Sequence, residues 1–238
     1  ERGARLVLVD ANEEVLKEVS AGIPHSKTVV GDLSSDEGCQ AIADAAVEIL
    51  GQVDMLINLA GMMSFSCFEE EDPGMMESII QVNLLGAMRL TRHLLPAMLE
   101  RDAGRIINVG SVFGSIGFAY FSAYSASKFG LRGFSEALRR EMYDTGIKVM
   151  YVAPRAVKTP LNTGRIMRMG EATKMNMDTP EHVVERILKA VDSDRQEVYI
   201  GFPESLFVQI NLRFPRLVDK ALAAQNRIAR AFAKDKNE

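Results

Sequence analysis

The sequence has few cysteines and no excess of positive charge, and both shortages narrow its possible functions. Its two cysteines, Cys39 and Cys67, match no metal-binding spacing and no disulfide framework. Lysine and arginine number 28 against 32 aspartate and glutamate residues, a net charge of −4. A mildly acidic chain lacks the basic surface that neutralises phosphates. We therefore expect free thiols, no metal site and no nucleic-acid partner.

Long apolar runs and a signal sequence are also missing. No run approaches the roughly 18 residues that a membrane-spanning helix needs. The opening residues, ERGAR, are mostly polar and give no sign of a secretory signal peptide. The hydrophobic share of 47% and the charged share of 25% are ordinary for a globular protein. With the reduced thiols, these features predict a cytoplasmic location.

The sequence does have a regular alternation of two kinds of segment. Short runs rich in valine and isoleucine are typical of strands buried on both faces. They cover residues 6–9, 28–30, 55–58, 105–109, 147–153 and 197–200. Segments with helical spacing lie between them, among them residues 35–50, 75–100, 123–144 and 181–191. The alternation predicts an α/β fold with a doubly wound, mostly parallel, Rossmann-like sheet, whose ligand lies beyond the carboxyl ends of the strands.

Glycines and one proline mark expected helix ends. Gly51, Gly104 and Gly146 stand where left-handed C-caps would fall. Pro180 can begin a helix, with Thr179 as its N-cap.

A tyrosine and a lysine one helical turn apart give the strongest chemical signal. In the segment YSASK, Tyr124 and Lys128 share a helix face. Free tyrosine has a pKa of about 10, and a neighbouring ammonium favours the phenolate and lowers that value. The pair is therefore a plausible device for proton transfer. Alone the spacing is weak evidence, since most such pairs lie on a protein's surface.

Further motifs stand in order around this pair. They are Asn58-Leu59-Ala60-Gly61, Asn83, Ser111 and Pro154…Thr159. Ser111 and the Asn58 motif each follow a predicted strand, at the edge where a parallel sheet binds its ligand. Together with Tyr-x-x-x-Lys, these motifs resemble the short-chain dehydrogenase/reductase family. The resemblance extends over the chain up to about Gly201.

The resemblance implies a catalytic role for four residues. Tyr124 would exchange a proton with the substrate oxygen while a hydride moves to or from a nicotinamide. Lys128 would lower the pKa of the tyrosine and hold the nicotinamide ribose. Ser111 would hydrogen-bond the substrate oxygen. Asn83 would hold a water that connects Lys128 to solvent.

The same resemblance implies a set of cofactor-binding residues. Asp10 ends the strand at residues 6–9, where a carboxylate can bind both ribose hydroxyls and repel a 2′-phosphate. Since Ala11 follows rather than an arginine, we expect NAD(H) in preference to NADP(H). The remaining cofactor contacts would come from Asp32, Leu33, Asn58, Ala60, Gly61, Tyr124, Lys128, Pro154, Val157 and Thr159. Arg155 stands where the family usually has glycine, which leaves the local backbone shape open.

The beginning of the sequence departs further from the family. Family members open with a strand and a glycine-rich loop that cradles the pyrophosphate, and nothing before Arg5 can supply them. Roughly 25 residues are expected there, including a central strand. An incomplete sequence and a genuine truncation are both open explanations.

The substrate is expected to be lipophilic. Residues 161–178 lie where the family has a mobile lid, and they contain four methionines, which adapt to irregular apolar shapes. We expect Phe113, Phe118 and Met167 to line the pocket. An alcohol or carbonyl compound of sterol-like, acyl-chain or aromatic type would suit them. The alternative is that these side chains only fill the core or a subunit contact.

The tail beyond the domain of residues 1–201 has its own character. Residues 202–238 form an expected helical extension, basic and amphipathic, in which Leu217, Ala221, Ala224 and Ile228 can share one face. Such a helix can lie on a membrane through residues 213–238. It can also pack on a partner subunit or on its own domain, which is the more common use.

We therefore expect an oxidoreductase that moves a hydride between NAD(H) and a lipophilic secondary alcohol or ketone, with Tyr124 as general acid and base. An NADP(H)-dependent carbonyl reductase and a catalytically silent binding or scaffold protein of the same fold are the alternatives. The resemblance also implies a homodimer or homotetramer formed through the helices at residues 75–100 and 123–144.

Overall fold

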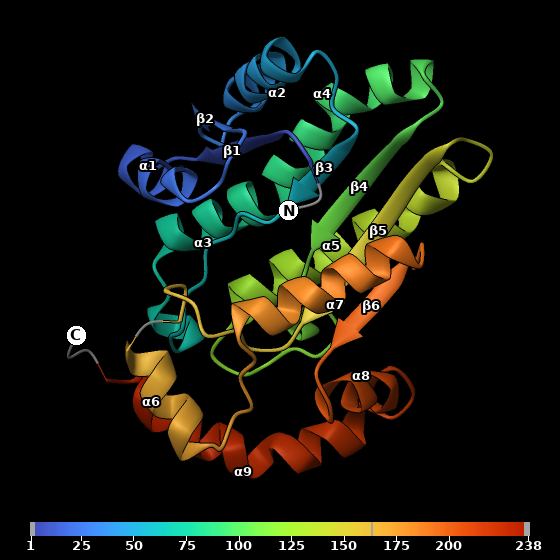
Figure 1. The fold of residues 1–238 in the computed structure, drawn as a ribbon. Coiled ribbons are helices and arrows are strands. Elements are labelled where there is room, and N and C mark those ends of the chain that lie inside the picture. The colour runs from blue at the N-terminus through green and yellow to red at the C-terminus, as the bar shows by residue number, and fades with distance from the viewer. Residues whose placement is uncertain (1–2, 163, 236–238) are drawn as a thin grey trace.

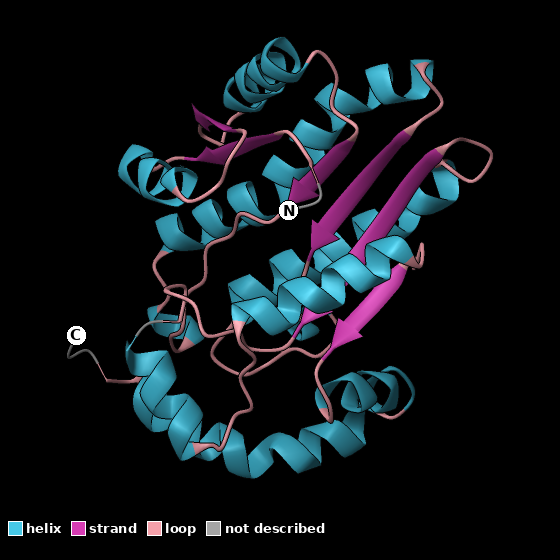
Figure 2. Cartoon of the chain, viewed as in Figure 1, coloured by secondary structure: helices cyan, strands magenta, loops and turns pink. Residues whose placement is uncertain are grey.

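A computed structural model describes residues 3–162 and 164–235 of the chain. Parallel strands form the centre and helices cover both faces (Figures 1 and 2). The elements are β1 (Leu6–Asp10), α1 (Glu13–Ala21), β2 (Ser26–Val30), α2 (Asp36–Leu50), β3 (Met55–Asn58), α3 (Pro73–Ile80), α4 (Ala87–Glu100), β4 (Gly104–Val109), α5 (Ser122–Glu141), β5 (Ile147–Pro154), α6 (Gly164–Ala172), α7 (Pro180–Asp192), β6 (Glu197–Ile200), α8 (Glu204–Arg213) and α9 (Pro215–Ala233). All six predicted strands are confirmed.

The strands form two parallel sheets rather than one. One sheet has the order β3-β4-β5-β6, and the other pairs β1 with β2. The two share a core, because Val9 and Val29 pack against the same cluster as Leu56 and Ile106. No ladder joins β1 to β3 among the described residues, so each keeps an edge of unpaired backbone groups. The doubly wound architecture is confirmed.

The predicted long helix at residues 75–100 is interrupted. A π-helical turn, Gln81–Gly86, separates α3 from α4 without ending the helical path. Turns of this kind occur often at functional sites. Asn83 lies within the turn and is buried. The turn therefore aims its side chain inward.

Two of the predicted helix ends are confirmed. Gly51 ends α2 with φ = 82°, and its N–H donates to the Val47 carbonyl. Thr179 caps α7, accepting a hydrogen bond from the His182 N–H.

The other two predicted C-caps are wrong. α4 ends at Glu100 with Arg101 as its C-cap, and the left-handed residue after the cap is Asp102, with φ = 48°. Gly104 and Gly146 instead lie close to other atoms. A Cβ on Gly104 would lie 2.7 Å from Met98 Sδ, and one on Gly146 would lie 1.7 Å from the Asp102 carbonyl oxygen. Both positions are glycine because of close packing.

The C-terminal helices pack on the α/β core. Val208 of α8 and Val218 of α9 join a buried cluster with Val112 and Ile116. In Figure 1, α9 curves beneath the domain from α8 toward α6. Within the described part of the chain, no helix has both the length and the apolarity needed to span a membrane.

Candidate active site

The carboxyl ends of β3, β4 and β5 open onto one cavity of about 500 Å³. Most of its wall is apolar, and the polar side chains converge at one place. The lining includes Gly61, Met63, Ser111, Phe113, Phe121, Tyr124, Lys128, Pro154, Val157, Thr159, Ile166, Met175, Val183 and Ile187. A concave apolar site with a few convergent polar groups is the usual form of a small-molecule pocket.

Ser111 stands at the end of β4, where the chain turns into the short 3-10 helix Val112–Gly114. Its backbone is extended, and its Oγ accepts a hydrogen bond of 3.1 Å from the Phe113 N–H. The Ser111 side chain lies beside that of Tyr124, where it acts to lower the pKa of the tyrosine. The serine and tyrosine, thirteen residues apart in the sequence, therefore meet as the motif predicts.

Tyr124 projects from the first turn of α5 into an apolar cluster. Only 7% of the residue is exposed, and Phe65, Phe121 and Ile166 surround it. Burial raises the pKa of Tyr124 to about 12, because a phenolate loses its hydration there. The Ser111 side chain opposes this shift without cancelling it. The pKa of Tyr124 is therefore raised, and the lowering expected from Lys128 is wrong.

The position of the Lys128 side chain explains why its ammonium has so little influence on the pKa of Tyr124. Its Nζ lies 5.8 Å from the centre of the Tyr124 ring and donates to the Val109 carbonyl at 3.1 Å. Lys128 is 4% exposed, and this burial lowers its own pKa to about 8. The charged form of Lys128 therefore predominates at pH 7 and is lost as the pH rises through about 8.

Asn83 braces the loop after β3. Its Oδ1 accepts from the Met62 N–H at 2.7 Å, and its Nδ2 donates to the Met62 carbonyl at 2.8 Å and to Ser127 Oγ at 3.0 Å. These bonds tie the π-helical turn, the loop and α5 together. The side-chain amide is therefore occupied by protein groups, and the expected water relay stays a prediction.

The residues predicted for the adenosine half lie away from the cavity. Asp10 is exposed at the end of β1 and accepts from the Asn12 N–H at 2.9 Å. Asp32 accepts from both the N–H and the hydroxyl of Ser34, which lowers the pKa of Asp32. Leu33 packs against the core. None of the three lines the cavity as the described residues define it.

The residues of the Asn58-Leu59-Ala60-Gly61 motif have two kinds of position: Asn58 links two strands, and Gly61 lines the cavity. Asn58 Nδ2 donates to Asn108 Oδ1 at 2.8 Å, which links β3 to β4. Ala60 is exposed, whereas Gly61 lines the cavity. A Cβ on Gly61 would lie 3.6 Å from Lys128 Nζ, so any side chain there would enter the space in front of the lysine.

The segment after β5 keeps its strand despite Arg155. Pro154 pairs with Ile200, and the Arg155 N–H donates to the Ile200 carbonyl. Pro154, Val157 and Thr159 all line the cavity, and their expected contact with a cofactor stays a prediction. The doubt about the local backbone is thereby resolved.

Arg155 itself forms an ion-pair cluster that the sequence did not reveal. Its Nη2 lies 2.7 Å from Asp178 Oδ1 and its Nη1 lies 3.0 Å from Glu204 Oε2. A second bond joins Nε to Asp178 Oδ2 at 3.0 Å, so the Asp178 pair is bidentate. Because Arg155 and Asp178 flank the segment of residues 156–177, their ion pair joins the two ends of this segment. Glu204 links the same arginine to the start of α8.

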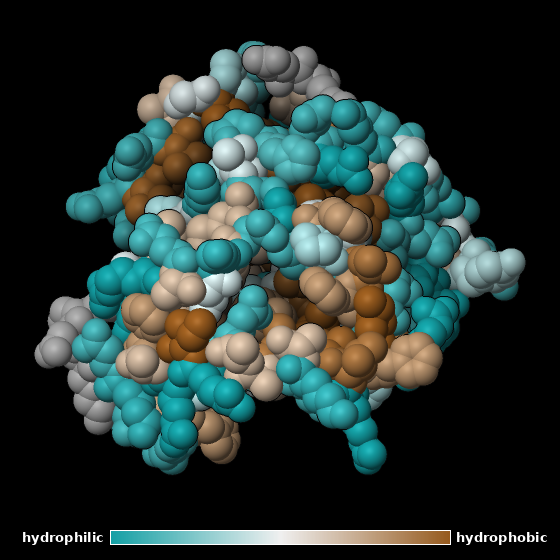
Figure 3. Space-filling view, turned by 90° about the horizontal axis from the view of Figure 1, so that it is seen from below, coloured by the Kyte–Doolittle hydropathy of each residue, from teal (hydrophilic) through white to brown (hydrophobic). Residues whose placement is uncertain are grey.

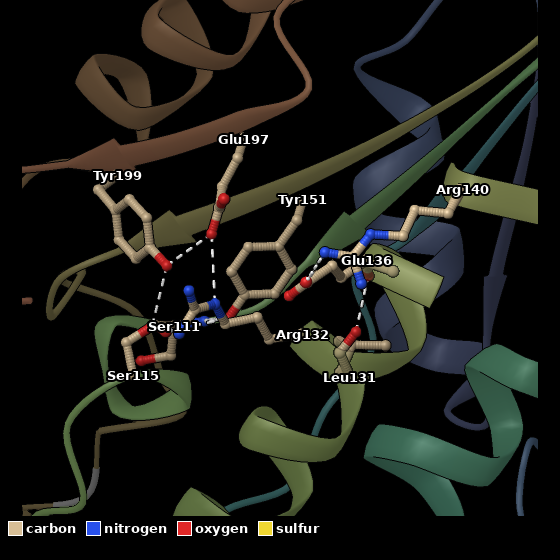
Figure 4. Close-up of polar contacts among 10 residues, drawn as sticks. Ser111, Ser115, Leu131, Arg132, Glu136, Arg140, Tyr151, Glu197 and Tyr199 are labelled. Carbon is tan, nitrogen blue, oxygen red and sulfur yellow. Dashed lines mark hydrogen bonds and ion pairs between the residues drawn. The ribbon is translucent and has the colours of Figure 1, made fainter. Parts of the chain in front are cut away.

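Tyr151 is a second buried residue that the sequence did not single out. It lies under the Ser111 loop, is 1% exposed, and its hydroxyl donates to the Ser111 carbonyl at 3.2 Å. Figure 4 shows this ring beside Tyr199, whose hydroxyl is within hydrogen-bonding distance of Ser115 and Glu197. Tyr151 thus supports the backbone that presents Ser111.

Of the three predicted substrate-pocket residues, only Phe113 lines the cavity. Phe118 stacks behind Phe113 with ring centres 4.3 Å apart. Met167 is half-buried on α6, but its neighbour Ile166 points inward in its place. The lid methionine that reaches the described cavity is Met175. Helix rotation of about 100° per residue explains why the prediction missed by one position.

The amino-acid sequence matches a known protein family. A family model described as short chain dehydrogenase matches residues 1–169. The chain belongs to the short-chain dehydrogenase/reductase family. A ketoacyl reductase, HetN, from Nostoc sp. is 36% identical over 71% of the chain, which spans 59% of that relative's length. The bovine dehydrogenase/reductase SDR family member 7B is 33% identical over 94% of the chain and 74% of the relative.

Solved structures of the family agree with the fold. A short-chain dehydrogenase from Streptomyces avermitilis has a TM-score of 0.79 and 28% identity over 94% of this chain and 90% of its own. A metagenomic short-chain oxidoreductase solved with NADP has a TM-score of 0.60 and 32% identity over 64% of this chain and 71% of its own. A member from Burkholderia phymatum solved with NAD has a TM-score of 0.79 and 22% identity, covering 90% and 86%. This short-chain dehydrogenase/reductase is thus an NAD(P)-dependent oxidoreductase, and the comparisons favour neither cofactor.

The support that Tyr151 gives to the Ser111 backbone can be tested by disturbing the packing around Tyr151. A Cβ on Gly110 would lie 2.2 Å from Tyr151 Oη, so we expect Gly110→Ala to lower the free energy of unfolding by about 1–3 kcal/mol through overpacking. Gly133→Ala is the control, since Gly133 is helical with nothing within 4 Å, and alanine should leave stability unchanged or raised by up to about 1 kcal/mol. Urea denaturation measures both. Equal stability of the two variants would contradict the role given to Tyr151.

Proposed function

We propose that this chain transfers a hydride between a nicotinamide cofactor and a lipophilic secondary alcohol or ketone, with Tyr124 as general acid and base. The observation that carries the proposal is the placement of Tyr124 beside Ser111, both in the wall of one mostly apolar cavity. A substrate oxygen placed there meets two hydroxyl donors. The rest of the substrate meets Phe113, Ile166 and Met175.

The residues around this point fit a nicotinamide cofactor. Gly61 leaves open the space in front of Lys128, and Pro154, Val157 and Thr159 form the facing wall. Tyr124 and Lys128 would hold the ribose next to the nicotinamide. When bound, the cofactor supplies the hydride for reduction or accepts it in oxidation.

The proton chemistry falls to the chain's own residues. In reduction, the Tyr124 hydroxyl donates its proton to the substrate oxygen, which Ser111 also hydrogen-bonds. The raised pKa of Tyr124 keeps this proton in place at neutral pH, so the hydroxyl is protonated before reduction begins. Lys128 would contribute through the cofactor, because its ammonium would hold the ribose that places the nicotinamide beside Tyr124.

NAD(H) is the proposed cofactor, on the strength of Asp10. This carboxylate ends β1, is exposed, and is followed by Ala11 rather than a basic residue. Such a carboxylate binds ribose hydroxyls and repels a 2′-phosphate.

The role of Tyr124 is tested by removing its hydroxyl. Tyr124→Phe keeps the ring in its apolar cluster, so folding and cofactor binding should persist while the rate of 2-decanone reduction falls by at least about 100-fold. Tyr120→Phe is the matched control, because Tyr120 packs in the same cluster without lining the cavity. Acetone should be a poorer substrate than 2-decanone if the pocket selects lipophilic compounds. An unchanged rate in Tyr124→Phe would leave a binding or scaffold role as the better account.

Lys128 gives the reaction a pH dependence. Its charged form is present below a pKa of about 8 and is lost as the pH rises through that value. We therefore expect kcat/KM for reduction to fall above about pH 8. Lys128→Arg should be slower but independent of pH over this interval, since arginine stays charged. A wild-type profile that stays flat to about pH 10, with circular dichroism confirming the fold, would contradict this assignment.

Cofactor choice is tested at Asp10. The wild type should have a lower KM for NADH than for NADPH. Asp10→Asn keeps an acceptor for the Asn12 N–H but removes the charge, so the preference should shrink by about 10- to 100-fold. Glu14→Gln, an exposed carboxylate on α1, is the control and should not change the ratio. A wild type that prefers NADPH would overturn the choice of NAD(H).

A further inference from the structure

Helix α9 has two apolar faces, and only one of them is packed. Val218 and Leu222 contact α8 and the Ser111 region, while Ala229 and Ala233 contact the cluster around Tyr124. The other face contains the residues that the sequence grouped together, and it lies outside. Leu217 is 59% exposed and Ile228 is 41% exposed, with the exposed Ala221 and Ala224 between them.

The exposed face of α9 continues onto α8. Phe207 of α8 and Ala221 of α9 line the same small cavity, so the two helices adjoin there. The exposed apolar residues of this surface, which we call the outer face, are Phe202, Leu206, Phe207, Leu212, Phe214, Leu217 and Ile228. Figure 3, which views the molecule from below, shows apolar residues exposed among hydrophilic ones on this side. Such contiguous apolar surface marks an interaction site.

Basic side chains follow one edge of the outer face. Lys220 and Arg227 are exposed on α9, each three or four residues from Leu217 or Ala224 and hence on the adjoining side of the helix. Between positions 213 and 234 there are six basic residues and one acidic residue, Asp219. This surface is therefore positive on a chain whose net charge is −4.

We propose that the outer face docks on the surface of an anionic lipid bilayer, with α9 lying in the interface plane. An exposed apolar stripe beside a row of lysine and arginine is the pattern of an interfacial helix, since the stripe enters the acyl boundary and the long cations reach the headgroups. Two copies of the chain would bring like charges together at this face, which disfavours self-association. The inference is independent of the proposed reaction.

Vesicle co-sedimentation tests the proposal without a substrate. The full chain is mixed with vesicles of phosphatidylcholine alone or with one third phosphatidylserine. The charge variant is Arg216→Glu with Lys220→Glu, and its control is Lys27→Glu with Arg92→Glu, two exposed cations on β2 and α4. The apolar variant is Leu217→Gln with Ile228→Gln, and its control is Val15→Gln with Val19→Gln on α1.

We expect the wild type and both controls to sediment with the anionic vesicles, more weakly with neutral ones and less at high salt. Each variant of the outer face should bind at least about tenfold more weakly, with its circular dichroism unchanged. Sedimentation of the outer-face variants equal to that of their controls would overturn the proposal. So would the absence of vesicle binding by the wild type. If the wild type bound no vesicles but formed a dimer, and the variant with Leu217→Gln and Ile228→Gln were a monomer, the outer face would be an interface between copies.

Discussion

The burial of a tyrosine and a lysine on successive turns of one helix is the constraint on which the site depends. Desolvation opposes the charged form of each, so the pKa of Lys128 falls to about 8 and that of Tyr124 rises to about 12. The two pKa values therefore move apart, and at neutral pH both groups keep their protons. The buried Lys128 ammonium needs an acceptor, and the Val109 carbonyl at the end of β4 provides it. Ser111 stands beside Tyr124 at the same strand end.

The end of β4 is closely packed, which holds the groups that meet Lys128 and Tyr124 in place. Tyr151 fills the space beneath it, and Gly110 and Gly114 have no side chain because the Tyr151 ring occupies the positions of their Cβ atoms. Asn83 fixes the neighbouring loop through Met62. A strand end held from below and from the side keeps Ser111 and the Val109 carbonyl directed at α5. Rigid support of this kind is what a site for proton transfer requires.

The features that could be predicted from the sequence are those that local patterns determine. Strand and helix positions follow from periodicities within each segment, and the Ser111, Tyr124 and Lys128 group follows from a fixed motif. Long-range side-chain pairs were not predictable: Arg155 finds Asp178 and Glu204 at separations of 23 and 49 residues. Tyr151 resembles any buried strand residue, so nothing local marked its support of Ser111. For α9, two apolar stripes satisfied the same helical period, and only packing shows which one faces inward.

The C-terminal extension contributes to the pocket rather than standing apart from it. Glu204 at the start of α8 shares Arg155 with Asp178, which joins the extension to the base of residues 156–177. At the other end, Ala229 and Ala233 contact the cluster that holds Tyr124 and Ile166. Alanines permit this close approach because they have no bulk beyond Cβ. A single helix therefore separates the outer face from the wall of the cavity.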